Sequence, residues 1–130
     1  MTPEPIRRWH AYIDQADPAL LEALLDETAV FESPVVHTPQ VGKAITLKYL
    51  LGAANVLNGE SFRYLNEWYG EGSAILEFAS EVDGVRINGI DMIWWNDDGL
   101  ITRFKVMVRP LKAINLLHQK MAAMLAAMAG

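Results

Sequence analysis

One acidic residue stands in the most apolar stretch of the sequence. Asp91 lies in the segment 89–95, where every other residue is apolar or glycine. Because burial disfavours the charged form of a carboxyl group, Asp91 should have a raised pKa and be able to donate a hydrogen bond or transfer a proton. The alternative is a structural pair with an arginine or a hydroxyl on a neighbouring strand. Asp91 is therefore the first candidate for a catalytic residue.

The three histidines are the other side chains that could exchange protons near neutral pH. His37 follows Ser33 and Pro34 in a predicted loop, where it is either an acid–base group or an exposed histidine without a role. His10 and His118 are expected at the surface. The histidines are too scattered for a metal-ligand signature and no carboxylate cluster completes one, so no metal site is predicted.

Composition limits the class of protein. The 130 residues contain no cysteine, and 16 acidic against 11 basic residues give a net charge of −5. This balance argues against a binder of duplex nucleic acid, which needs a basic face. No apolar signal core or membrane-length apolar run is present, and neither a glycine-rich phosphate loop nor a nucleophile elbow occurs. We expect one cytoplasmic globular domain, 1–130, without a membrane segment and without a cofactor.

Helices are predicted at both ends of the sequence. Apolar residues recur at helical spacing after Pro3 and Pro5, and Asp17 with Pro18 forms a start signal for a second helix whose apolar stripe ends at Leu25. A third helix is expected over 43–57. The last one follows Pro110 and ends in a Met/Ala-rich stretch, 121–128, for which a fraying tail, a dimer contact and a lid remain open.

The segment between these helices has the pattern of strands. Four strands, 61–69, 73–82, 85–95 and 100–109, are separated by short turns rich in glycine and aspartate, which is typical of antiparallel hairpins. A shorter strand, 29–33, precedes the third helix. This order predicts an α+β fold in which helices pack on one face of a curved sheet.

The strand that carries Asp91 is apolar on both of its faces. An antiparallel strand with one wet face should alternate between apolar and polar residues, and 89–95 does not. One face is expected to be covered by the protein's own helices and the other by a second subunit. A homodimer through the outer sheet face is the prediction; burial by another element is the alternative.

Five segments, 29–34, 42–45, 89–93, 97–101 and 104–111, give the chain a family resemblance. In order and spacing it resembles the nuclear transport factor 2-like superfamily, which includes ketosteroid isomerases, SnoaL-type polyketide cyclases, scytalone dehydratase and limonene epoxide hydrolase. The resemblance implies a cone-shaped curved antiparallel sheet packed against three N-terminal helices, plus a C-terminal helix. It also implies an apolar cavity inside the cone, and dimers through the outer sheet face in many members.

The ketosteroid isomerase site can be compared position by position. The resemblance places Ser33 where those enzymes have the general-base aspartate, Trp9 where they have a tyrosine, and Asp91 where they have a protonated aspartic acid. Serine cannot hold a proton taken from carbon and indole does not titrate, so steroid isomerisation by that mechanism is not expected. Glu32 is a substitute base only if its strand is shifted in register, and Arg103 is expected to point outward.

The resemblance also proposes the cavity wall. If Asp91 points inward, strand alternation sends Ile93 and Trp95 the same way, and the loop that holds His37 should lie near the cavity mouth. Aromatic residues in such a wall are either plain core or part of a recognition surface. The predicted ligand-binding residues are Trp9, Tyr12, Phe31, Ser33, Tyr49, Ile93, Trp95, Phe104, Val106 and Val108.

Two functions remain open from the sequence. The first is cofactor-free acid–base chemistry of the isomerase or cyclase type on an apolar carbonyl compound. In it Asp91 is the proton donor or the partner of an oxyanion, and His37 or a bound water molecule is a possible base. The second is a non-catalytic module that binds a small apolar ligand or serves as a dimerisation scaffold. Loss of two isomerase groups favours the second function, and retention of Asp91 favours the first.

Overall fold

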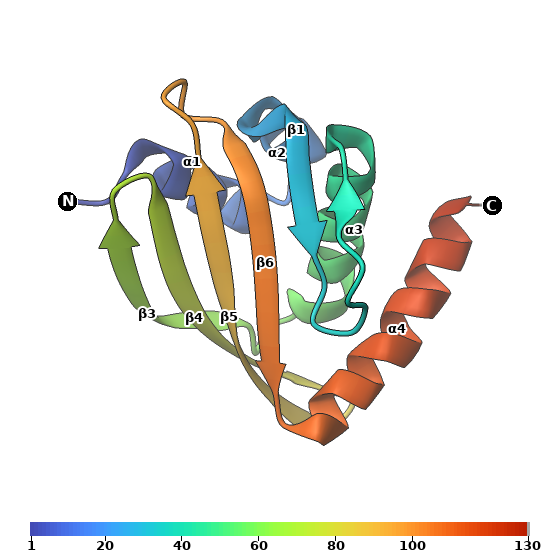
Figure 1. Ribbon diagram of the computed structural model, residues 1–130. Helices are drawn as coiled ribbons and strands as arrows, with labels where there is room; N and C mark the ends of the chain where they lie inside the picture. The colour runs from blue at the N-terminus through green and yellow to red at the C-terminus, as the bar shows by residue number, and fades with distance from the viewer. Residues whose placement is uncertain (130) are drawn as a thin grey trace.

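The computed structural model describes residues 1–129 of the chain, and over these residues it has four helices and one six-stranded curved sheet (Figure 1). The predicted α+β class is confirmed. The elements, in chain order, are α1 (Glu4–Gln15), α2 (Pro18–Leu24), β1 (Leu25–Glu32), β2 (Gln40–Val41), α3 (Lys43–Leu57), β3 (Arg63–Gly70), β4 (Ser73–Val82), β5 (Val85–Trp95), β6 (Ile101–Arg109) and α4 (Leu111–Ala129).

The first two helices begin at the signals in the sequence. α1 has a proline in its first turn and is followed by the C-cap residue Ala16, whose backbone is left-handed with φ 54°. The Asp17 carboxylate caps α2 by accepting from the Ala19 N–H at 3.0 Å. The expectation for Leu25 was wrong, because this residue leaves the helix and starts β1, where it pairs with Ile101.

The four-stranded antiparallel meander is confirmed, with β3 starting at Arg63 rather than at position 61. Its turns use left-handed backbone at Gly72, Asp83, Gly84 and Gly99.

β1 makes the sheet mixed rather than wholly antiparallel. It pairs parallel to β6, with Phe31 opposite Phe104, and antiparallel to the short β2 on its other side. The strand order is β2-β1-β6-β5-β4-β3. The parallel pair joins segments far apart in the sequence, so no hairpin signal announces it.

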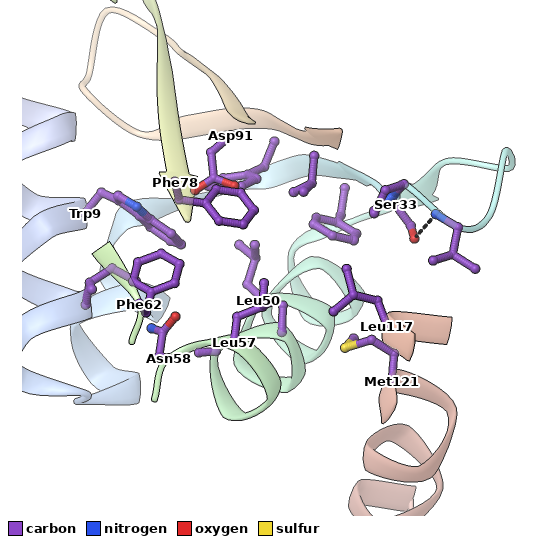
Figure 2. A pocket seen from close by; sticks show the side chains of 18 of the residues that line it. Trp9, Ser33, Leu50, Leu57, Asn58, Phe62, Phe78, Asp91, Leu117 and Met121 are labelled. Carbon is purple, nitrogen blue, oxygen red and sulfur yellow. Dashed lines mark hydrogen bonds between the residues drawn. The ribbon is translucent and has the colours of Figure 1, made fainter. Parts of the chain in front are cut away.

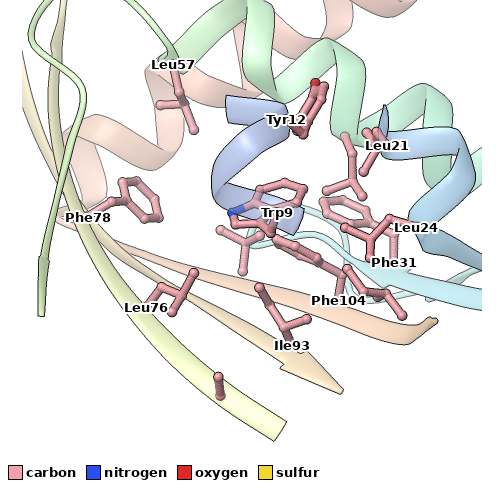
Figure 3. Packing of buried hydrophobic residues seen from close by; sticks show 14 of the residues in the cluster. Trp9, Tyr12, Leu21, Leu24, Phe31, Leu57, Leu76, Phe78, Ile93 and Phe104 are labelled. Atoms are coloured by element: carbon pink, nitrogen blue, oxygen red, sulfur yellow. The ribbon is translucent and has the colours of Figure 1, made fainter. Parts of the chain in front are cut away.

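All four helices lie on the concave side of the sheet, and the core fills the space between them (Figure 1). Figure 3 shows the ring of Trp9 from α1 packed against Phe104 from β6, with Phe31 from β1 beside it. On β5 the residues Gly89, Asp91 and Ile93 are buried and the residues between them are half-exposed. The side expected for Asp91 is therefore the side it takes.

α4 runs along α3 and closes one end of the concave side (Figure 1). Gly52 in α3 lies against the side chains of Met121 and Met124, so α4 can approach closely there. Among residues 1–129 no helix combines the length and the apolar character that a membrane span requires.

Gly89→Ala should lower the free energy of unfolding by about 2 to 3 kcal/mol, because a methyl group at this position has no space. A Cβ on Gly89 would lie 2.5 Å from Phe78 Cζ and 2.7 Å from the Met107 carbonyl oxygen. Urea unfolding measures the loss. Gly59→Ala is the control, since a Cβ there meets nothing within 4 Å. A loss at Gly89 no larger than that of the control would contradict the packing described.

Candidate functional site

A cavity of about 70 Å³ lies between the concave face of the sheet and the helices α1, α3 and α4 (Figure 2). Its wall is mostly aliphatic and aromatic. The polar groups that reach it are few. Asp91, Tyr64 and Trp9 are joined by hydrogen bonds, Ser33 lies away from Asp91 and Trp9, and the exposed Asn58 follows α3. A concave apolar space with a few polar groups is the usual form of a small-molecule site.

Asp91 is the acidic residue in this wall. It sits in the middle of β5 between Leu76 and Val106 of the neighbouring strands, and it is 6% exposed. The Tyr64 hydroxyl donates to its Oδ2 at 2.7 Å. Burial raises the pKa of Asp91 to about 7, although the bond from Tyr64 opposes this shift. Asp91 can therefore serve as either acid or base near neutral pH.

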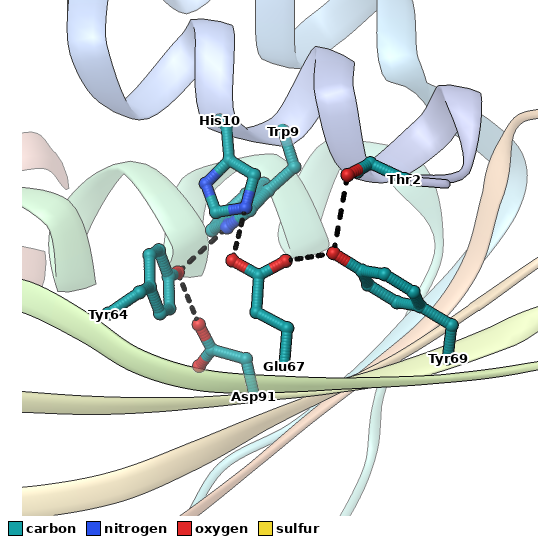
Figure 4. A network of polar contacts seen from close by, with 7 residues as sticks. All are labelled: Thr2, Trp9, His10, Tyr64, Glu67, Tyr69 and Asp91. Atoms are coloured by element: carbon teal, nitrogen blue, oxygen red, sulfur yellow. Dashed lines mark hydrogen bonds and ion pairs between the residues drawn. The ribbon is translucent and has the colours of Figure 1, made fainter.

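Tyr64 in turn is held by Trp9. The indole Nε1–H of Trp9 donates to the Tyr64 hydroxyl oxygen at 2.8 Å, so the side chains form a chain from α1 through β3 to β5 (Figure 4). Burial, with the nearby charge of Asp91, holds the pKa of Tyr64 well above its ordinary value. Tyr64 is therefore a neutral hydrogen-bond donor over the whole physiological pH range.

The second oxygen of Asp91 faces the cavity. Every fully buried side-chain nitrogen and oxygen in the described part of the chain has a hydrogen-bond partner. The bond recorded for Asp91 is the one to Oδ2, so Oδ1 must keep contact with open space. The neighbouring space is the cavity that Asp91 lines.

Solved structures place the chain in a family. It is 35% identical to a steroid delta-isomerase from Pseudomonas aeruginosa over 96% of this chain and 91% of the other, with a TM-score of 0.90. A bacterial protein with a cystatin-like fold from Silicibacter pomeroyi is 30% identical over 92% and 84%, with a TM-score of 0.85. An NTF2-like protein from Mesorhizobium loti shares the fold at 20% identity over 82% and 89%, with a TM-score of 0.71. The chain belongs to the nuclear transport factor 2-like superfamily.

No family model matches this NTF2-like protein, and no curated protein matches it. The resemblance inferred from the sequence is confirmed by the solved structures alone. Because one fold serves many chemistries, the superfamily does not define what the cavity does.

Half of the ligand-binding residues expected from the sequence reach the cavity of the NTF2-like protein. Those that line it are Trp9, Phe31, Ser33, Phe104 and Val106. The others lie behind or beside this wall: Tyr12 packs on Trp9 and Tyr49 on Phe31, while Ile93 is buried in the core and Trp95 and Val108 are partly buried at its edge. Strand alternation gives the face of a residue and not its depth along a curved strand.

The expected partner base is not brought to Asp91. His37 is exposed in the loop before β2 and does not line the cavity. Ser33 does line it, and its Oγ accepts from the Val35 N–H at 3.0 Å. A serine hydroxyl held in this way can make a hydrogen bond to a ligand but cannot act as a base.

Glu32 points to the outer face of the sheet, as its alternation with Ser33 predicts. Its carboxylate pairs with Arg103 Nε at 2.5 Å, and this bond holds the pKa of Glu32 below its usual value. Arg103 also covers the ring of Trp94 at 4.4 Å, which confirms that it points outward. Glu32 is thus committed to a surface ion pair.

Tyr64 is the site residue that the sequence did not reveal. A register irregularity between Tyr64 and Asn66 shifts the alternation of β3, so that simple counting cannot tell which of its residues face inward. The alternative partner for Asp91 foreseen from the sequence was an arginine or a hydroxyl on an adjacent strand. The partner is a hydroxyl, and it comes from two strands away.

A second polar cluster lies beside Tyr64 at the edge of the sheet (Figure 4). His10 Nε2 pairs with Glu67 Oε2 at 2.7 Å, and Tyr69 donates to the other oxygen of Glu67 at 2.6 Å. The His10 ring meets the Tyr64 ring edge-on at 5.2 Å. His10 is therefore partly buried in an ion pair, whereas His118 is exposed as expected.

Proposed function

We propose that the cavity binds a compact apolar molecule that bears a carbonyl group, and that Asp91 in its neutral form donates a hydrogen bond to the carbonyl oxygen. The observation that carries this proposal is a buried carboxyl group whose only side-chain partner within residues 1–129 is a neutral hydroxyl. Without a cation beside it, Asp91 keeps a proton that other carboxyl groups lose at the same pH.

The chemistry proposed is cofactor-free acid–base catalysis of the isomerase or cyclase type. A carboxylic acid that donates to a carbonyl oxygen stabilises the charge that develops there when an adjacent C–H bond ionises. With a pKa of about 7, Asp91 is divided between its acid and base forms near neutral pH. Since Ser33 is no base and His37 lies outside the cavity, a water molecule is proposed to relay the proton from carbon to hydroxide or to a buffer base in the solvent.

The size of the cavity sets the size of the molecule. Its 70 Å³ are less than half of the roughly 150 Å³ of an engineered cavity that holds benzene. A four-ring steroid, the substrate class in the name of the similar Pseudomonas protein, is therefore not proposed here. Leu117 and Met121 of α4 form the adaptable part of the wall, because methionine is flexible, and a five-membered ring is proposed to enter when these two side chains move aside.

Cyclopentanone and its hydrocarbon counterpart methylenecyclopentane test the binding step. They have nearly the same shape, and only the ketone accepts a hydrogen bond. Isothermal titration should show about fivefold tighter binding of the ketone to the wild-type protein, as one neutral hydrogen bond predicts. Asp91→Leu should remove this preference. Equal affinity of the wild type for both molecules would contradict the proposed function.

Hydrogen exchange separates catalysis from binding. In D2O, proton NMR should show the α-hydrogens of cyclopentanone exchanging at least about tenfold faster with the wild-type protein than in buffer. Asp91→Asn should return the rate to background, and Asp14→Asn, at an exposed position on α1, should not change it. Ketone binding without accelerated exchange would support the second candidate function, a non-catalytic ligand-binding module. This function is favoured because neither Ser33 nor His37 supplies a base that works together with Asp91.

We also propose that two copies associate through the outer face of the sheet. This face carries Trp68 at 55%, Met107 at 47% and Leu65 at 45% exposure, beside the half-exposed Met92 and Trp94. Large apolar side chains gathered on one face are typical of association surfaces. Sedimentation at micromolar concentration should show a dimer, and Trp68→Lys should shift it to monomer. A wild-type monomer at that concentration would overturn the proposal.

A further inference from the structure

The chain of hydrogen bonds behind the cavity runs in one direction. An indole N–H can only donate, so Trp9, 2.8 Å from the Tyr64 hydroxyl oxygen, makes that oxygen an acceptor. The hydroxyl proton of Tyr64 is then directed to Asp91 Oδ2, 2.7 Å away. Figure 4 shows the three side chains in this order, from the helix to the sheet.

This direction decides which oxygen of a neutral Asp91 carries the proton. Because Oδ2 accepts from Tyr64, the proton belongs on Oδ1, the oxygen that reaches the cavity. The reverse arrangement would have Asp91 donate to Tyr64, and the Tyr64 hydroxyl proton would then have no recorded acceptor in residues 1–129. A buried donor without an acceptor is strongly disfavoured.

We propose that Trp9 and Tyr64 are positioning residues that hold the proton of Asp91 on Oδ1 and so make the cavity selective for ligands that present a hydrogen-bond acceptor. The proposal rests on the proposed function, in which Asp91 donates to a ligand. It adds the ligand class, which is compact apolar ketones, esters and nitriles in preference to hydrocarbons of the same shape. It also gives the Trp9 indole N–H a role, donation to the Tyr64 oxygen, that packing of an aromatic ring does not supply.

A second pair of polar side chains lies beside this chain of hydrogen bonds. His10 from α1 and Glu67 from β3 form their own ion pair beside the Tyr64 ring, and Tyr69 from β3 donates to Glu67. Neither member of this pair makes a recorded hydrogen bond to Trp9 or Asp91, so the donor chain is not interrupted. Because the His10 ring lies against the Tyr64 ring, the His10→Gln variant is the control for this neighbouring pair.

The first test is the ratio of the affinities for cyclopentanone and methylenecyclopentane. Tyr64→Phe should lower this ratio about threefold, since Oδ2 loses its donor and the carboxyl group loses its orientation. Trp9→Phe should lower it less. Tyr12→Phe removes a hydroxyl without a recorded bond next to Trp9 and should leave the ratio unchanged. A change of cavity shape alters both affinities together, so the ratio reports on the hydrogen bond.

The outcomes separate this inference from the proposed function. A wild-type preference for the ketone that survives undiminished in Tyr64→Phe overturns the donor chain and leaves the proposed function intact. Absence of the preference in the wild type overturns the proposed function. The donor chain is then decided by the measurement below, which uses neither ligand.

The second test uses the wild-type protein alone. Ionisation of Asp91 strengthens the bond from Tyr64, and the Tyr64 oxygen then attracts the Trp9 N–H more strongly. The NMR signal of the Trp9 indole proton should therefore move downfield as the pH rises through the titration of Asp91. The shift should vanish in Asp91→Asn and persist in His10→Gln. A Trp9 signal that does not respond to Asp91 overturns the donor chain.

Discussion

Replacing Asp91 with asparagine should make the protein more stable than the wild type near pH 8, and should have much less effect near pH 4. The pKa of Asp91 rises from 3.8 to about 7 on burial, so between these values the folded state holds a proton that the unfolded state has released. Stability from this group is therefore fully present below pH 3.8 and is lost as the pH rises toward 7. Asparagine does not ionise, so the free energy of unfolding of the variant does not fall in this way.

The size of the effect follows from the shift. At 1.36 kcal/mol for each pKa unit, the wild type should lose about 4 kcal/mol relative to Asp91→Asn between acid and neutral pH. Other carboxyl groups act in the opposite sense. Hydrogen bonds from Thr28 and Arg103 lower the pKa values of Asp26 and Glu32, respectively. The stability that these two carboxylates contribute to the folded state is therefore lost as the pH falls. These groups are the same in both proteins and cancel in the difference.

Urea unfolding at a series of pH values measures this difference. The free energy of unfolding of Asp91→Asn minus that of the wild type should increase with pH and level off above about pH 7. Asp14→Asn, at an exposed position on α1, controls for the removal of one carboxyl group. A difference independent of pH would show that Asp91 has no raised pKa.

Phe104→Ala should lower the free energy of unfolding by about 4 kcal/mol, the usual loss for a buried phenylalanine. Phe104 is 1% exposed, and its ring lies 4.8 Å from that of Trp9 and 6.3 Å from that of Phe31. It lines the cavity, so its removal should also enlarge the space in front of Asp91. Leu111→Ala, at a position 71% exposed, should change stability by less than about 0.5 kcal/mol.

Benzene provides the matching ligand experiment for Phe104→Ala. Because a ligand that binds only the folded state raises its stability, benzene at saturating concentration should restore part of the lost melting temperature in this variant. The wild type, with its 70 Å³ cavity, should respond less. Equal responses of both proteins would mean that the space left by Phe104 does not join the cavity.

Local signals in the sequence were sufficient for most of the fold. Asp17 with Pro18 marked the start of α2, and turn residues such as Gly84 and Gly99 separated the strands of the meander. The parallel pairing of β1 with β6 was not predicted, because it depends on contacts between distant segments. Leu25 fitted a helical stripe equally well, and only its pairing with Ile101 makes it part of a strand.

The candidate site was predicted less completely. An acid among apolar residues identified Asp91, since both its burial and its raised pKa follow from its neighbours in sequence. Its partner Tyr64 was missed because an irregularity in β3 hides the face to which this residue points. His37 was placed near the cavity by its sequence distance from Ser33, but a loop residue carries no periodic signal for its direction.

Membership in the superfamily and retention of a function are separate matters for this chain. The Pseudomonas steroid delta-isomerase is 35% identical, yet Ser33 stands where the resemblance to ketosteroid isomerases expects the general base. Asp91 is the one residue that the resemblance matches to an isomerase group without a change of residue type. In this protein that acid is supported from behind by Tyr64 and Trp9, so its free oxygen is available to a ligand.

The ionisation of Asp91 is the property on which the proposed chemistry depends. Carbon-detected NMR of its carboxyl carbon, followed from acid to alkaline pH in the wild-type protein, gives the pKa directly. A pKa of about 7 is expected, as for a buried acid that meets only the Tyr64 hydroxyl. A pKa below about 4, the ordinary range of aspartate, would contradict the neutral, cavity-facing acid described for Asp91.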